Sequence, residues 1–214
     1  MKRMIVILFL LEFAIILNAQ QKTPEIFISE ARALRADSLF QEAINLLLEG
    51  VEVYPFDSDI HLQLGLAWGD LAQQGGEEGD MMNDTMTAMK GLKEAFAEFE
   101  KAVSLSPTNY NAHFYFGAYG VDVPAFFGKL DEGVAHLETA KALLEEKFPD
   151  GQPEAFAALY RFLGQGYFMQ ERFAEAQAAW EKVLELTPEG EHSEAAQIGL
   201  EELKKQNAIN ESEN

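Results

Sequence analysis

The stretch LGQGYFMQERFAEAQAAWEKVLELTP, residues 163–188, carries the clearest structural pattern in the chain. Each of its halves places apolar residues three and four positions apart, the spacing of one buried stripe on an α-helix. Gly164 and Ala176 are small enough to let two antiparallel helices approach, with Trp180 filling the space between them. Pro188 ends the second half because it has no N–H to continue a helix. The stretch predicts a helix-turn-helix hairpin that must stack on neighbours to bury its stripe.

Degenerate copies of this stretch lie upstream. They repeat its anchor spacing, in which a small residue is followed four positions later by a large one and three positions later by another small one: Ala43, Leu47 and Gly50; Ala95, Phe99 and Ala102; Gly133, Leu137 and Ala140. The pair Leu163-Gly164 recurs as Leu64-Gly65 and Phe116-Gly117. The pattern resembles the tetratricopeptide repeat (TPR) family, whose unit is a helix-turn-helix of 34 residues. The resemblance implies an all-α fold, a right-handed α-α superhelix of about four repeats closed by a C-terminal capping helix.

The anchors divide the chain into segments. We expect a solenoid over 20–206 with repeats at about 24–57, 58–109 (insertion 73–89), 110–150 (insertion 120–129) and 157–190, followed by a cap at 191–206. Insertion 73–89 is rich in glycine and charge and is expected to be a loop, with helix resuming between Thr85 and Met89. The cap is expected to pack along Ala195, Ile198, Leu200 and Leu203, and the polar tail 207–214 to be disordered.

The first 19 residues have the composition of an export signal. Lys2 and Arg3 precede an apolar run, and Ala19 is small, as cleavage by signal peptidase requires. We expect cleavage after Ala19 and export, to a bacterial periplasm. The alternative is an uncleaved membrane anchor, although the run is shorter than a spanning helix needs. With no cysteine in the chain, lipoprotein anchoring is excluded.

The chain is strongly acidic, with a formal net charge of −20. Nucleic acid and anionic membrane surfaces are therefore poor partners, because no basic patch is available to neutralise phosphates. The acidic surface either keeps the protein soluble or matches a basic partner.

No motif for catalysis, phosphate binding or zinc binding occurs. His61 and His113 occupy a position that the TPR family fills with a packed side chain, so we expect both to be structural. His136 and His192 have no evident partner, and the acidic residues of insertion 73–89 lack the ligand spacing of a calcium loop. The sequence predicts no enzyme, no metal site and no cofactor.

The TPR resemblance implies a binding surface on the concave face, which the first helices of successive repeats line. Its positions correspond here to Ile28, Arg32 and Arg35 in repeat one, Leu62 and Leu66 in repeat two, Asn111 and Phe114 in repeat three, and Arg161, Gln165, Phe168 and Met169 in repeat four. Such a groove suits an apolar or aromatic group, with a carboxylate held by a guanidinium. The alternative is that a cap helix, an insertion or another subunit closes this face.

Phe126 and Phe127 stand out in the connector of repeat three, between Pro124 and Gly128. They either plug the gap between repeats or form a lid or docking surface.

The function expected is that of a non-catalytic TPR adaptor, which binds an unidentified protein or peptide on its concave face in the periplasm. One alternative is an accessory component of a periplasmic uptake system that binds a small apolar ligand, with Phe126 and Phe127 closing over it. Another is a self-assembling scaffold.

Overall fold

The computed structural model describes residues 22–74, 81–149 and 151–212, and these form nine α-helices and one short 3-10 helix. No β-strand occurs in the described ranges, so the all-α prediction is confirmed. The predicted signal segment, residues 1–19, lies outside them. The chain divides into two compact units, residues 1–91 and 92–214.

The described residues of the first unit form three complete helices, α2 (Pro24–Ala36), α3 (Phe40–Val53) and α4 (Ser58–Gln74). Pro24 is at the start of α2, where its missing N–H costs no hydrogen bond. Helix α2 packs on both α3 and α4. Their shared core consists of small and branched apolar side chains: Ala31, Ala43, Ile44, Leu47, Ile60, Leu64 and Ala67.

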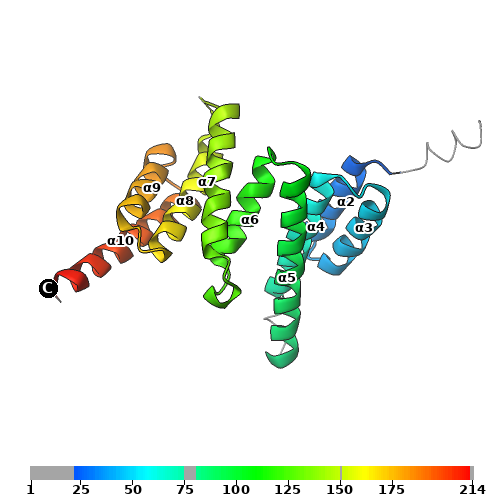
Figure 1. The fold of residues 1–214 in the computed structure, drawn as a ribbon, viewed down its shortest axis with the longest axis horizontal. Coiled ribbons are helices and arrows are strands. Elements are labelled where there is room, and N and C mark those ends of the chain that lie inside the picture. Colours follow the sequence, from blue (N-terminus) through cyan, green and yellow to red (C-terminus); the bar gives the residue numbers. More distant parts are fainter. Residues whose placement is uncertain (1–21, 75–80, 150, 213–214) are drawn as a thin grey trace, which may run out of the picture. The chain divides into compact units, whose positions relative to one another are not determined.

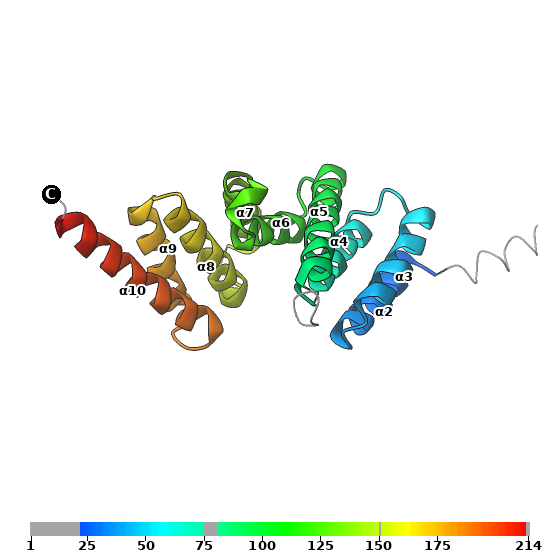
Figure 2. The same cartoon turned by 90° about the horizontal axis from the view of Figure 1, so that it is seen from below.

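Helix α5 (Met81–Leu105) runs from the first unit into the second. The rest of the second unit comprises α6 (Tyr110–Asp122), η1 (Ala125–Phe127), α7 (Leu130–Lys147), α8 (Pro153–Met169), α9 (Phe173–Leu186) and α10 (Glu191–Ser212). Figures 1 and 2 show that α8, α9 and α10 lie side by side, as do α6 and α7. From α6 onward each α-helix packs on the next, and α8 also contacts α6 and α10. This is the stacking of helical hairpins that the repeats predict.

The turn inside the hairpin has the same geometry in the first and the last repeat. Ser38 and Glu171 both adopt the left-handed conformation, with φ of 59° and 60°. In both turns the next residue donates its N–H to a carbonyl five positions earlier, Leu39 to Leu34 and Arg172 to Tyr167. These bonds satisfy carbonyls that the end of a helix leaves open. The shared turn supports the internal repetition read from the sequence.

The predicted anchors form the core of the hairpins. All twelve residues of the four anchor sets that the pattern defines are buried: Ala43, Leu47, Gly50, Ala95, Phe99, Ala102, Gly133, Leu137, Ala140, Ala176, Trp180 and Val183. A Cβ atom added at Gly164 or Gly199 would lie within 2.5 Å of the Trp180 indole. The indole of α9 thus lies directly against glycines of α8 and α10, which confirms the space-filling role predicted for Trp180.

The crossing of α6 and α7 is equally close. A Cβ added at Gly117 would lie 2.5 Å from Leu137 Cγ and 2.7 Å from the carbonyl oxygen of Gly133. One added at Gly120 would lie 2.8 Å from the Cα of Gly133. The two backbones can pack at this distance only because glycine has no side chain.

Three sequence predictions need correction. Helix α5 begins at Met81, ahead of the expected 85–89, because residues 81–90 contain no glycine or proline and begin with two methionines, which favour helix. Helix α10 continues to Ser212 through most of the tail predicted to be disordered, since no glycine or proline follows Gly199. Ile198 is 69% exposed, because Ala196 and Leu203 form the packed face of α10.

In the described part of the chain, no helix is both long and apolar enough to span a membrane.

Candidate functional site

In the first unit, the predicted arginines are tied to their own fold. Arg35 Nε donates to Asp70 Oδ2 at 2.6 Å, and its Nη1 donates to Gln63 Oε1 at 3.3 Å. Arg32 Nε donates to the same Gln63 oxygen at 3.3 Å. These bonds join α2 to α4. Because the Arg35–Asp70 pair is already charge-balanced, this part of the predicted site has a structural role.

The apolar positions predicted in the first unit are also largely unavailable. Leu62 and Leu66 are 3% and 4% exposed, and Ile28 is half-buried against the core of α2, α3 and α4. A ligand could contact little of these side chains.

The second unit brings four predicted residues onto two neighbouring helices. Asn111 and Phe114 lie on α6, and Arg161 and Gln165 lie on α8, which contacts α6 directly. The ring of Phe114 meets that of Phe162 edge to face, with 5.8 Å between centroids. We call the surface formed by Asn111, Phe114, Arg161, Phe162 and Gln165 the α6–α8 face.

Arg161 differs from the other arginines in the described ranges. Its guanidinium lies over the ring of Phe162, 4.5 Å from the centroid, and its buried Nε has no hydrogen-bond partner. Arg172, by contrast, bonds to Glu175, Gln170 and Glu138. A buried donor without an acceptor is costly, commonly by about 1–3 kcal/mol. Of the arginines that the structure describes, Arg161 is therefore the one best able to donate a hydrogen bond to an incoming group.

Asp122 borders this guanidinium. Gln165 Nε2 donates to Asp122 Oδ1 at 3.1 Å. Partial burial raises the pKa of Asp122, although much of the residue stays accessible, and nearby Arg161 opposes that rise. The α6–α8 face thus combines a cation and two aromatic rings, with the anion of Asp122 at its border.

A small cavity of about 110 Å³ opens beside Phe114, between α6, α7 and α8. Its walls are mostly apolar: Tyr110, Asn111, Phe114, Tyr115, Ala140, Leu144, Ala155, Ala158 and Leu159. Its volume suits one side chain rather than a drug-sized molecule, which needs about 300–1,000 Å³.

The remaining predicted site residues lie elsewhere. Phe168 packs against Phe173 and Trp180, with ring centroids 5.6 and 5.8 Å away, so it belongs to the core between α8 and α9. Met169 is 41% exposed near the end of α8. Phe126 is 72% exposed in η1, and its ring stacks on that of Phe127 at 4.7 Å. Phe126 is thus not buried between repeats as a plug.

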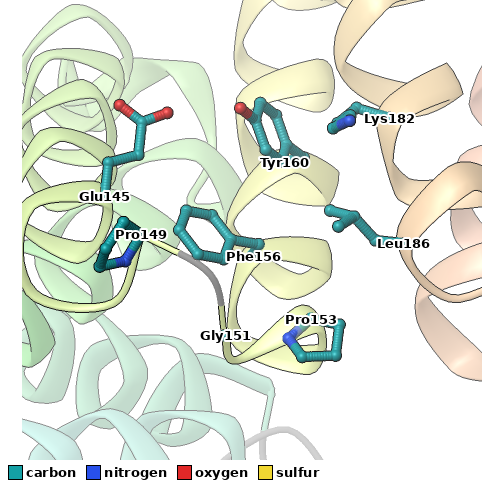
Figure 3. A pocket seen from close by; sticks show the side chains of 8 residues that line it. All are labelled: Glu145, Pro149, Gly151, Pro153, Phe156, Tyr160, Lys182 and Leu186. Atoms are coloured by element: carbon teal, nitrogen blue, oxygen red, sulfur yellow. The ribbon is translucent and has the colours of Figure 1, made fainter.

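A larger pocket of about 440 Å³ was not predicted (Figure 3). Phe156 and Tyr160 project into it from α8, Lys182 and Leu186 from α9, and Glu145 from α7. The connector after α7 adds Pro149 and Gly151, and Pro153 lines it from the start of α8. In the sequence, only the long link between repeats three and four relates to this pocket. The residues of that link follow no repeat pattern, so they predict a spacer and not a pocket.

The histidines predicted to be structural make matching contacts. His61 Nε2 lies 3.1 Å from the carbonyl oxygen of Pro55, and His113 Nε2 lies 3.1 Å from that of Pro107. His136, for which the sequence offered no partner, lies against His113, with 2.8 Å between their Nδ1 atoms. Among the residues that the structure describes, no three His, Asp or Glu side chains gather as a metal site.

Comparisons with known proteins agree with the helical fold described above. Residues 157–189 match the family model of the tetratricopeptide repeat. The fold is similar to that of a thermophilic TPR protein of Thermus thermophilus, with a TM-score of 0.62, 22% identity, and coverage of 92% of this chain and 96% of the other. The fold is an all-helical one like that of TPR solenoids, and residues 157–189 are the part that matches the TPR family model.

Other solved structures show the same fold at lower identity. MamA from Desulfovibrio magneticus RS-1 aligns with a TM-score of 0.55 and 18% identity, over 86% of this chain and 95% of that one. Human IFIT1, solved as a dimer with m7Gppp-AAAA, aligns with a TM-score of 0.64 and 17% identity, over 88% of this chain and 40% of its own. A comparison with curated protein sequences finds no match. At these identities the likeness concerns the fold alone, and the family model supports the TPR assignment.

Proposed function

We propose that the protein is a non-catalytic adaptor that binds a segment of another protein on the α6–α8 face. The observation that carries this proposal is Arg161, whose buried Nε lacks an acceptor and whose guanidinium is held over Phe162. An incoming carboxylate would supply the missing acceptor, as a charge-assisted hydrogen bond. The 110 Å³ cavity beside Phe114 would receive one apolar side chain of the same segment.

A nucleic-acid ligand is a weaker candidate. IFIT1 was solved with m7Gppp-AAAA, but binding a phosphate backbone needs a cluster of basic side chains. This chain has a net charge of −20 and, on the α6–α8 face, one arginine beside an aspartate.

The proposal is tested by substitutions on the α6–α8 face, using a partner first captured from cells. Arg161→Met keeps an unbranched stem that can lie on Phe162 but removes the charge, and Phe114→Ala removes one wall of the small cavity. Each should weaken binding about tenfold or more, the effect of losing about 1.4 kcal/mol at an interface hot spot. The matched control is Lys205→Met, which removes one positive charge from exposed α10.

Unchanged affinity in both variants, with helicity retained by circular dichroism, would refute the proposed site. Loss of binding in the Lys205→Met control as well would point to net charge as the cause.

A small ligand in the 440 Å³ pocket is the second candidate, because that volume lies in the usual range for small-molecule sites. Native mass spectrometry of protein purified from cells would reveal a co-purifying ligand. Substituting Tyr160 with alanine, in the pocket lining, should release that ligand, whereas Arg161→Met should not.

We also propose that the protein acts after export, in the periplasm. The support is the composition of residues 1–19, with two basic residues, an apolar run and Ala19. Intact-mass analysis of the protein from the periplasmic fraction should show Gln20 as its first residue. A full-length chain in the membrane fraction would favour the uncleaved anchor.

A further inference from the structure

Two imidazoles face each other across the contact between α6 and α7. His113 Nδ1 and His136 Nδ1 are 2.8 Å apart, and the ring centroids are 4.9 Å apart. His113 Nε2 is 3.1 Å from the Pro107 carbonyl, which can only accept a hydrogen bond. His113 therefore carries its proton on Nε2 and accepts at Nδ1, and His136 donates from its own Nδ1. This arrangement requires the His113 ring to be neutral.

The surroundings disfavour a positive charge on either ring. His113 is buried and His136 is half-buried, with its ring 4.0 Å from that of Phe116 by centroids. The charged groups beside the pair are Lys129 before α7, Glu132 on α7 and Glu100 on α5, and Lys129 bonds to both carboxylates. Burial lowers the pKa of His113. Burial, followed by the neighbouring His113, lowers the pKa of His136 to about 4, while Glu132 opposes the shift.

We propose that the His113–His136 pair is an acid-sensitive latch, which holds α6 against α7 at neutral pH and is released when His113 is protonated. When His113 binds a second proton at Nδ1, two N–H groups point at each other, so the hydrogen bond between the helices is lost and a charge is left among apolar side chains. A second proton on His136 binds at Nε2, so it leaves this hydrogen bond in place and adds only a charge beside apolar side chains. The latch does not depend on whether the α6–α8 face binds a partner.

The direction of the pH effect follows from linkage. In the unfolded chain both histidines titrate near their ordinary pKa of about 6.5, so the unfolded state binds more protons than the folded state below that pH. The stability contributed by the neutral pair is fully present above about pH 6.5 and is lost as the pH falls towards 4. Between pH 7.5 and 5.0 we expect the folding equilibrium constant to fall on the order of tenfold through this pair.

The latch is tested first by NMR titration of the imidazole nitrogens in the full chain. Two neutral rings, with His113 protonated at Nε2 and His136 at Nδ1, should persist well below pH 6. Titration of both rings near pH 6.5 would overturn the proposal.

The second measurement is urea unfolding at pH 7.5 and 5.0. His136→Gln keeps an N–H donor but cannot titrate. On acidification from pH 7.5 to 5.0, its folding equilibrium constant should therefore fall by about tenfold less than that of the wild type. The control His61→Gln removes a histidine with the same carbonyl contact in the first unit, and it should keep the wild-type loss. Equal losses in His136→Gln and wild type would contradict the latch. If His136→Gln does not fold, the wild-type titration decides.

Discussion

The four arginines that the structure describes differ in what surrounds them rather than in their residue type. Arg32, Arg35 and Arg172 bond to side-chain oxygens of their own chain. Arg161 lies on the ring of Phe162, as Arg172 lies on that of Tyr167, but Arg161 keeps a buried Nε without an acceptor. Repeat position alone made Arg32, Arg35 and Arg161 equal candidates. Gln63 and Asp70 reach Arg32 and Arg35 only once α2 and α4 are packed, so the distinction could not be predicted from the sequence.

Gly117 provides a residue-scale prediction about helix packing. In Gly117→Ala the new methyl group would meet Leu137 and the backbone carbonyl of Gly133, which cannot move aside as a flexible side chain can. We expect a net loss of about 1–2 kcal/mol, because overpacking outweighs the gain in helix propensity. Urea unfolding measures this loss.

The matched control for that change is Gly151→Ala. No atom lies within 4 Å of a Cβ placed at Gly151, so its stability should change by less than about 0.5 kcal/mol. A neutral Gly117→Ala would show that the α6–α7 crossing is looser than described.

Residue spacing predicted the packing anchors well, and it predicted the surroundings of the candidate binding residues only in part. Anchors such as Ala176 and Trp180 follow from a repeated spacing, because every hairpin solves the same packing problem. Phe168 was assigned to the free surface by its repeat position, yet it packs on Phe173 and Trp180. A large ring near the end of a helix can turn towards either neighbour, and sequence spacing does not determine which.

At the scale of elements, α10 acts as the cover of the last repeat. Its Gly199 lies against the Trp180 indole, and Ala196 and Leu203 join the same core. Truncation after Gly190 should uncover Trp180, shift its fluorescence to longer wavelength and cost about 3 kcal/mol or more, the value of burying one to two large apolar side chains.

Truncation after Gln206 is the control for that experiment, since it leaves Ala196, Gly199 and Leu203 in place. It should leave the Trp180 emission and the melting temperature nearly unchanged. An unchanged spectrum after removal of all of α10 would contradict its capping role.

The start of α2 was predictable, because Pro24 marks it. Helix α8 also begins at a proline, Pro153, ahead of the repeat start expected at 157. Other boundaries were missed where no such residue occurs. Helix α5 starts ahead of the expected position and α10 continues past the expected end, because composition alone does not terminate a helix. The 440 Å³ pocket was missed for a related reason: it depends on how the link between α7 and α8 folds, and no repeat pattern covers that link.

For the whole molecule, the fold follows from a repeated helical hairpin. The proposed function follows from one residue, Arg161, whose buried Nε has no hydrogen-bond acceptor. The TPR pattern fixes which residues are buried in each hairpin. The acidic composition disfavours polyanionic partners. Arg161 and the rings of Phe114 and Phe162 form the surface on which we propose that a peptide carboxylate and an apolar side chain bind.

Site-specific photocross-linking in cells tests this central claim most directly. A photoreactive residue replacing Phe114 should give a discrete adduct with a partner protein, and Arg161→Met in the same chain should abolish it. A photoreactive residue at Ile198, exposed on α10, should give no such adduct. The account is contradicted if position 114 yields no adduct, or if its adduct persists unchanged when Arg161 is replaced.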